Sequence, residues 1–153
     1  SELILGKLTP YLGVSLLNVV TILFVADRWF NVPVRERLPL LLGLCVLFVL
    51  TSLATGLLIS AVSRSQFQAI QIAVFYVLPV FMLSGAYAPI EAIPETIRPV
   101  SYLFPLMYFC RAVRAVTLRG AGFFLVWRDM AVLSGFSLVL LYWAVLSFKK
   151  RVA

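Results

Sequence analysis

Four long stretches of the chain contain no charged residue, and polar positions within them are sparse. Nineteen uncharged residues lie at 8–26, and nineteen more lie at 130–148. Two further uncharged stretches, of twenty-six residues each, contain apolar cores at 38–62 and 67–87. Because a helix rises about 1.5 Å per residue, about twenty apolar residues cross a hydrocarbon layer of ~30 Å. The pattern therefore predicts four transmembrane helices, one in each stretch.

The same pattern argues against strands. None of the four stretches alternates apolar and polar residues as a half-buried strand does, and backbone groups in lipid must be hydrogen-bonded within the segment or in a closed barrel. The composition agrees with a membrane protein, because 63% of the 153 residues are hydrophobic and 12% are charged, against roughly half and a quarter in soluble domains. The predicted fold class is an all-α integral membrane protein that forms a single transmembrane domain over 1–153.

A proline-rich segment separates the third and fourth spans. The stretch "APIEAIPETIRPVSYLFPLMYF" has prolines at 89, 94, 99 and 105, and these prolines exclude one unbroken helix. Its charge-free second half is too short to cross a bilayer. We therefore expect a re-entrant or interfacial helical hairpin at 88–122, with one short helix starting near Glu95 and a second after Pro105.

The number of spans and the distribution of basic residues predict the topology. Four spans place both ends of the chain on one side of the membrane. All three lysines and the terminal "KKR" cluster fall on that side, and basic residues beside spans favour the cytoplasm. We therefore expect both ends to be cytoplasmic and the hairpin to lie on the outer face.

Several kinds of chemistry are missing from the sequence. There is no His, the two cysteines at 45 and 110 are isolated, and no GxxxxGK[ST] motif occurs, so neither a metal site nor an ATP site is predicted. None of the four spans contains Asp, Glu, Lys, Arg or His, which disfavours proton-driven transport. The net charge of +7 is typical of membrane topology signals rather than nucleic-acid binding. We expect neither enzymatic activity nor a directly bound cofactor.

Small and polar residues inside the spans are candidates for packing and for a hydrated path. Ser52, Gly56 and Ser60 recur every four residues, which lets helices approach closely. They pack either inside one subunit or at a dimer or translocation seam. Asn18 and Gln71 are the residues we expect to line a path, since an amide is costly to bury in lipid.

Three segments carry a resemblance to a known family. They are "LILGK" before the first span, "LLISAVSRSQFQAIQ" across the turn between the second and third spans, and "MLSGAYAPIEAIPETIRPVSYLFPLMYFCRAVRAVTLRGAG", which "WRDMAVL" follows. With these segments the chain resembles the C-terminal part of the membrane subunit of type 2 ATP-binding-cassette (ABC) exporters, the bacterial multidrug-type permeases. The matching hairpin residues are Ser84, Gly85, Pro89, Ile90, Pro94, Pro105, Leu106, Tyr108, Phe109, Arg114, Gly120 and Gly122. Cys110 and Arg111 depart from the family pattern, in which aliphatic or acidic residues are usual.

The resemblance implies a function and a set of partners. Residues 1–7 would belong to the coupling helix that contacts a cytoplasmic ABC ATPase, which would use ATP and Mg²⁺. The hairpin would act as a gate at the outer end of a substrate path, and a second permease subunit would complete that path. The implied location is the bacterial inner membrane. The coupling residues would be Glu2, Leu3, Ile4, Leu5, Gly6 and Lys7.

One alternative of another class stays open at this point. A non-transport scaffold or assembly protein of four helices would also lack ionisable residues in its spans. The broken hairpin favours the permease, because a scaffold has little use for an interrupted helix at membrane depth. A membrane enzyme is a more distant alternative, since the sequence offers no catalytic dyad.

Overall fold

The computed structural model describes residues 2–31, 37–120 and 122–152, and every regular element in these ranges is helical. Four helices are long and apolar enough to cross a membrane, which confirms the predicted fold class. Residues 1 and 121, which belong to the predicted coupling segment and hairpin, lie outside the described residues. The elements are α1 (Glu2–Trp29), α2 (Leu38–Val62), α3 (Gln66–Leu83), the 3₁₀ turn η2 (Ile90–Ala92), α4 (Arg98–Ser101), α5 (Pro105–Arg119) and α6 (Phe123–Val152).

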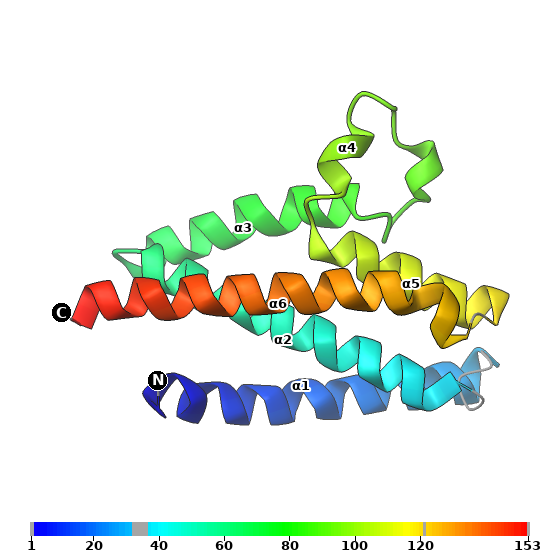
Figure 1. Cartoon of the computed structure of the whole chain (residues 1–153), viewed down its shortest axis with the longest axis horizontal. Coiled ribbons are helices and arrows are strands. Elements are labelled where there is room, and N and C mark those ends of the chain that lie inside the picture. Colours follow the sequence, from blue (N-terminus) through cyan, green and yellow to red (C-terminus); the bar gives the residue numbers. More distant parts are fainter. Residues whose placement is uncertain (1, 32–36, 121, 153) are drawn as a thin grey trace.

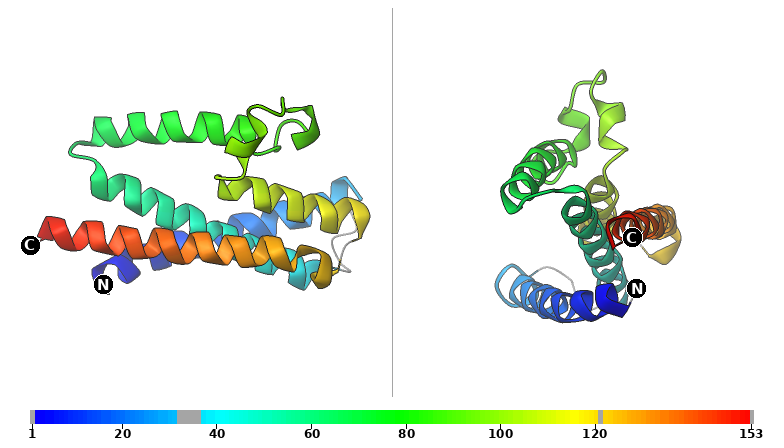
Figure 2. Two further views of the ribbon diagram at one scale, coloured as in Figure 1. Left: turned by 45° about the horizontal axis from the view of Figure 1, so that its top comes forward. Right: turned by 90° about the vertical axis from the view of Figure 1, so that its left-hand side faces the viewer.

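The helices are arranged around α2 (Figure 1). Viewed along the long axis, α2 lies in the middle, with α1, α3 and α6 on different sides of it (Figure 2). The two ends of the chain lie at the same end of the bundle. At the opposite end, α5 runs beside the first half of α6, and the segment with η2 and α4 projects sideways from the bundle.

The core lies mainly between α2 and α6, with α5 closing one side. Leu44 of α2 and Leu133 of α6 belong to one fully buried cluster, and Ala54 of α2 and Ala144 of α6 are also fully buried. The Thr51 hydroxyl donates to the Leu47 carbonyl at 2.8 Å, so this buried polar group is satisfied within its own helix. Small and β-branched side chains are thus buried on the helices that form the most extensive contact of the bundle, where such side chains let helices approach closely.

Two of the helices are longer than the uncharged stretches predicted. The helix α1 starts at Glu2 rather than at 8, so the expected coupling segment forms the first turns of a continuous helix, not a separate one. Pro10, which the predicted start at 8 placed in the first turn, is therefore inside α1. The helix α6 starts at Phe123 rather than at 130, because Asp129 is buried and paired and so does not mark the end of the helix.

The third span is shorter than predicted, and the hairpin starts earlier. The helix α3 ends at Leu83, not at 87. In the turn that follows, Gly85 has φ +82°, a backbone conformation that cannot continue an α-helix. The last helix of the hairpin, α5, ends at Arg119, and Gly120 caps it in the left-handed region, with φ +62°. This glycine cap is the common way to end a helix.

Candidate functional site

The turn after α3 sends the chain back tightly upon itself. Ser84 is fully buried, and its hydroxyl donates to the Phe81 carbonyl at 3.1 Å and accepts from the Ala86 N–H at 3.2 Å. A Cβ added to Gly85 would lie 2.8 Å from Cγ1 of Ile90. The backbone of the turn therefore lies directly against Ile90, and only glycine fits there.

The prolines of the hairpin define a closed loop. Pro89 precedes the η2 turn, and the Pro94 carbonyl accepts from the N–H groups of both Ile97 and Arg98 at 3.0 Å. Nη2 of Arg98 donates back across the loop to the Ile93 carbonyl at 3.1 Å. These bonds satisfy backbone groups that the prolines leave without helical partners.

Pro105 starts the helix that returns along the bundle. It is buried at the first position of α5, where a missing N–H costs nothing. Leu106 faces a cavity beside Val80 and Phe81 of α3. The helix α3 stops short of the end of the bundle, and α5 starts near this break and continues toward that end (Figure 1). The family motif thus forms a helix interruption, as the prolines predict.

An ion pair that the sequence pattern does not predict joins α5 to α6. Nη2 of Arg111 donates to a carboxylate oxygen of Asp129 in a short contact, and Nε of Arg111 lies 3.1 Å from the same oxygen. The Asp129 side chain is 8% exposed and the Arg111 side chain 45% exposed. The hydrogen bond from Arg111 to Asp129 raises the pKa of the guanidinium further, so Arg111 is charged at every working pH.

Tyr108 connects the same ion pair to the loop. The Arg111 guanidinium lies 5.4 Å from the centre of the Tyr108 ring, within the range of a cation–π contact. The Tyr108 hydroxyl donates to the Tyr102 carbonyl at 2.8 Å. Burial raises the pKa of Tyr108, so the phenol stays protonated and keeps this donor. Burial likewise raises the pKa of the neighbouring Cys110 thiol, which keeps it uncharged at neutral pH.

The predicted packing stripe of α2 faces an open groove. Ser52, Gly56 and Ser60 are all exposed, and a Cβ added to Gly56 would meet no atom within 4 Å. The groove, about 330 Å³ in volume, lies between α2, α3 and the start of α5, and Ser52 and Gly56 contribute to its wall. The described residues of this chain thus leave the stripe uncovered. Packing within a subunit and packing at a seam between subunits both stay predictions.

We expect Gly56→Ala to leave the stability of an isolated subunit unchanged or to raise it by up to about 1 kcal/mol, since Ala favours a helix over Gly. Thermal unfolding of the monomeric protein in detergent measures this effect. A clear loss of stability would show that α2 packs more tightly within the subunit than the groove indicates.

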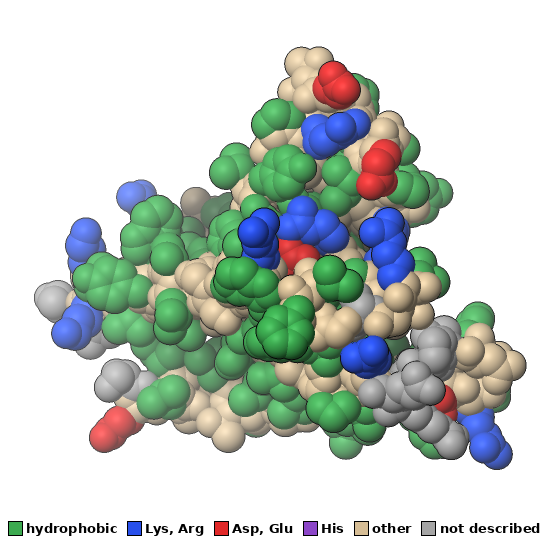
Figure 3. Space-filling view, turned by 45° about the vertical axis from the view of Figure 1, so that its right-hand side comes forward, with side chains coloured by type: hydrophobic (Ala, Val, Ile, Leu, Met, Phe, Trp, Pro, Cys, Tyr) green, Lys and Arg blue, Asp and Glu red, His purple; other side chains and the backbone are tan. Residues whose placement is uncertain are grey.

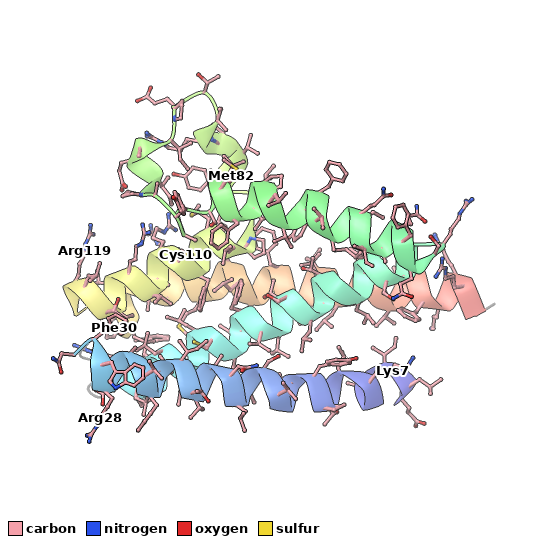
Figure 4. The ribbon with its side chains drawn as sticks, turned by 180° about the vertical axis from the view of Figure 1, so that it is seen from behind. Lys7, Arg28, Phe30, Met82, Cys110 and Arg119 are labelled. Atoms are coloured by element: carbon pink, nitrogen blue, oxygen red, sulfur yellow. The ribbon has the colours of Figure 1, made fainter. Side chains whose placement is uncertain are left out.

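The other predicted residues lie apart from the hairpin. Asn18 and Gln71 are both exposed, on α1 and α3, and these helices lie on different sides of α2 (Figure 2). A single chain therefore does not bring them together, and their role in a path stays a prediction. The segment Glu2–Lys7 lies at the end of the bundle opposite Arg119 (Figure 4).

Comparison with known proteins identifies the family. The family model "ABC-2 type transporter" matches residues 1–118, which include the four described helices α1 to α4 and most of α5. The chain belongs to the ABC-2 type transporter family. The match includes the ordered motif from Ser84 to Arg114, which builds the broken helix.

Several curated proteins of this family are similar to the chain. The "Probable multidrug ABC transporter permease YbhS" of Escherichia coli K12 is 38% identical over 78% of the chain and 32% of its own length. The "Inner membrane transport permease YhhJ" of the same strain is 27% identical over 99% of the chain and 41% of its own length. The "ABC transporter G family member 20" of Dictyostelium discoideum is 27% identical over 99% of the chain and 21% of its own length. The chain thus spans less than half the length of these relatives, and no solved structure matches it significantly.

Proposed function

We propose that this chain is part of the membrane-spanning permease subunit of an ATP-driven ABC exporter. A second permease subunit completes the substrate path, and a separate cytoplasmic ABC ATPase binds and hydrolyses ATP with Mg²⁺. The permease supplies binding surface and movement rather than bond chemistry. Its location is the inner membrane of a bacterium, with both described ends of the chain in the cytoplasm.

The observation that carries this proposal is the interrupted helix of the ABC-2 motif. The helix α3 ends at Leu83, just before the Ser84–Gly85 turn, and α5 starts at Pro105 beside the last turn of α3. An interruption inside a bundle costs hydrogen bonds, and it is tolerated where protein or a water-filled cavity covers it. A gate uses such an element, because two short helices can tilt separately where one long helix cannot.

The start of α1 supports the expected contact with an ATPase. Leu3 is 82% and Leu5 64% exposed, and both belong to the first turns of α1, whose start lies at the end of the bundle that holds both chain ends. The sequence places charged Glu2 and Lys7 on either side of them. Exposed apolar residues beside charges at the cytoplasmic end of a span suit a protein partner better than lipid.

We expect Leu3→Glu to lower co-purification of the full-length permease with its ATPase at least about fivefold, equivalent to roughly 1 kcal/mol of binding. The change places a charge at the centre of the proposed contact. Affinity purification through a tag on the ATPase, with the bound permease measured by quantitative immunoblotting, checks the expectation.

The matched control for this experiment is Phe30→Glu. Phe30 is also exposed, but it lies at the opposite end of α1 from Lys7 (Figure 4). This variant should retain the ATPase. Equal recovery of both variants, or no ATPase with the parent protein, would contradict the proposed coupling.

A further inference from the structure

A second cavity lies between α5 and the segment from the Ser84–Gly85 turn to η2, and it shares no lining residue with the apolar groove. It has a volume of about 430 Å³ and is bounded by the Ser84–Gly85 turn, by Ile90 and by one face of α5. Arg111, Arg114 and Arg119 contribute from α5, and Glu91 contributes from the loop. Three of the thirteen basic residues of the chain thus line one cavity.

Two of the three arginines in this cavity have no anionic partner among the described residues. Asp129 forms an ion pair with Arg111. Within the described residues Arg114 and Arg119 form no ion pair, and Glu91 pairs with neither of them. Arg114 is also partly buried. A partly buried guanidinium without an anion is costly, because it has lost part of its hydration and gained no partner.

The position of the cavity indicates which anion would occupy it. It lies at the end of the bundle away from the chain termini, where Figure 4 shows Arg119 beyond Cys110 on α5. Figure 3 shows basic side chains gathered around an acidic one on this face, below the projecting hairpin. Leu118, which lines the cavity, is 79% exposed, so exposed apolar surface adjoins the charged cavity as the chains of a lipid adjoin its headgroup.

We propose that this cavity binds a phosphate group, held by the guanidinium groups of Arg114 and Arg119. The fork of an arginine matches two phosphate oxygens at once, and such charge-assisted hydrogen bonds are roughly twice as strong as neutral ones. The phosphate is either the diester of a membrane phospholipid or a free phosphate group from solution. Binding of either kind needs no ATPase, so this proposal does not rest on transport.

Native mass spectrometry of the full-length protein in a neutral maltoside detergent tests the lipid source. Titration with phosphatidylglycerol should show bound lipid on the parent protein, with an apparent Kd raised about tenfold in Arg114→Gln and Arg119→Gln. Arg114→Lys keeps the charge but loses the forked guanidinium. Its apparent Kd for the lipid should lie between that of the two glutamine variants and that of the parent. Arg28→Gln is the matched control, because Arg28 is exposed at the same end of the bundle but on α1 (Figure 4).

A second measurement tests the free phosphate source. Excess inorganic phosphate, compared with chloride at equal ionic strength, should raise the thermal midpoint of the lipid-free parent protein if the cavity takes phosphate from solution. A shift that disappears in Arg114→Gln supports this source, and lipid binding without such a shift supports the phospholipid. If the arginine variants bind lipid as the parent does and phosphate causes no arginine-dependent shift, the proposal is wrong. If Arg114→Gln fails to fold, the same measurements on Arg119→Gln test the proposal, because Arg119 is exposed.

Discussion

Asp129→Asn is expected to lower the free energy of unfolding by about 1–3 kcal/mol. The change removes the carboxylate that Arg111 binds through both Nε and Nη2 and leaves the guanidinium without an anion. Breaking a fully buried pair costs more than this, but the Arg111 side chain is 45% exposed, so water replaces part of the lost interaction. Thermal or denaturant unfolding of the detergent-solubilised protein measures the loss.

A double-mutant cycle separates the ion pair from the packing of the two side chains. In the Arg111→Gln background, Asp129→Asn should cost clearly less than in the parent, since no charge is then left unpaired. Glu91→Gln is the control for loss of an acidic charge near the same arginines, because Glu91 is exposed and forms no ion pair within the described chain. Equal costs for Asp129→Asn in both backgrounds would show that the pair adds nothing to stability.

The long helices are the part of the fold that the sequence predicts well. The helix α2 covers 38–62 as the charge pattern indicates, because the helix and the uncharged stretch end at the same solvent boundary. The start of α6 is harder to predict from the sequence, because a charged residue such as Asp129 is expected outside the bilayer, yet it lies within α6. A charged residue marks the end of a helix only where water solvates the charge. The Asp129 carboxylate is paired with Arg111 instead. Such pairing depends on tertiary contact between residues eighteen positions apart.

The packing faces of the helices are less predictable than their positions. On α2 the spacing of Ser52, Gly56 and Ser60 predicts a contact, yet the small residues that are buried within this chain include Thr51 and Ala54. Both sets contain small side chains at helical spacing, so spacing alone does not distinguish them. One signal favours the buried set: Leu44, Thr51 and Ala54 repeat at intervals of seven and three, as in a coiled-coil seam.

The hairpin is predictable in kind but not in its contacts. Prolines and a glycine show where the helix is interrupted, since their backbone limits are local properties. The contacts of Tyr108 with Tyr102 and Arg111 depend on how the loop folds back, and no local rule supplies that. For the same reason the sequence identifies Arg114 as part of a motif but not as the wall of a cavity.

Gly85→Ala is expected to be more costly than any other change from Gly to Ala that we consider, at about 2–5 kcal/mol. Two effects add: φ of +82° strains an L-residue by about 1–2 kcal/mol, and a contact of 2.8 Å with Ile90 adds about 1–3 kcal/mol of overpacking. The variant should unfold at a lower temperature than the parent, and the hairpin should lose protection in hydrogen exchange before the α2–α6 core does.

Two glycines of the same chain serve to separate these effects. Gly120 has φ +62° but no neighbouring atom within 4 Å of an added Cβ, so Gly120→Ala should show the backbone strain alone. Gly56 has neither feature, and its replacement should cost nothing. The contact with Ile90 is then the difference between Gly85→Ala and Gly120→Ala, and Ile90→Ala in the Gly85→Ala background should recover part of it. Equal losses at positions 85 and 120 would mean that the turn does not lie against Ile90, and that the hairpin is less tightly closed than its geometry indicates.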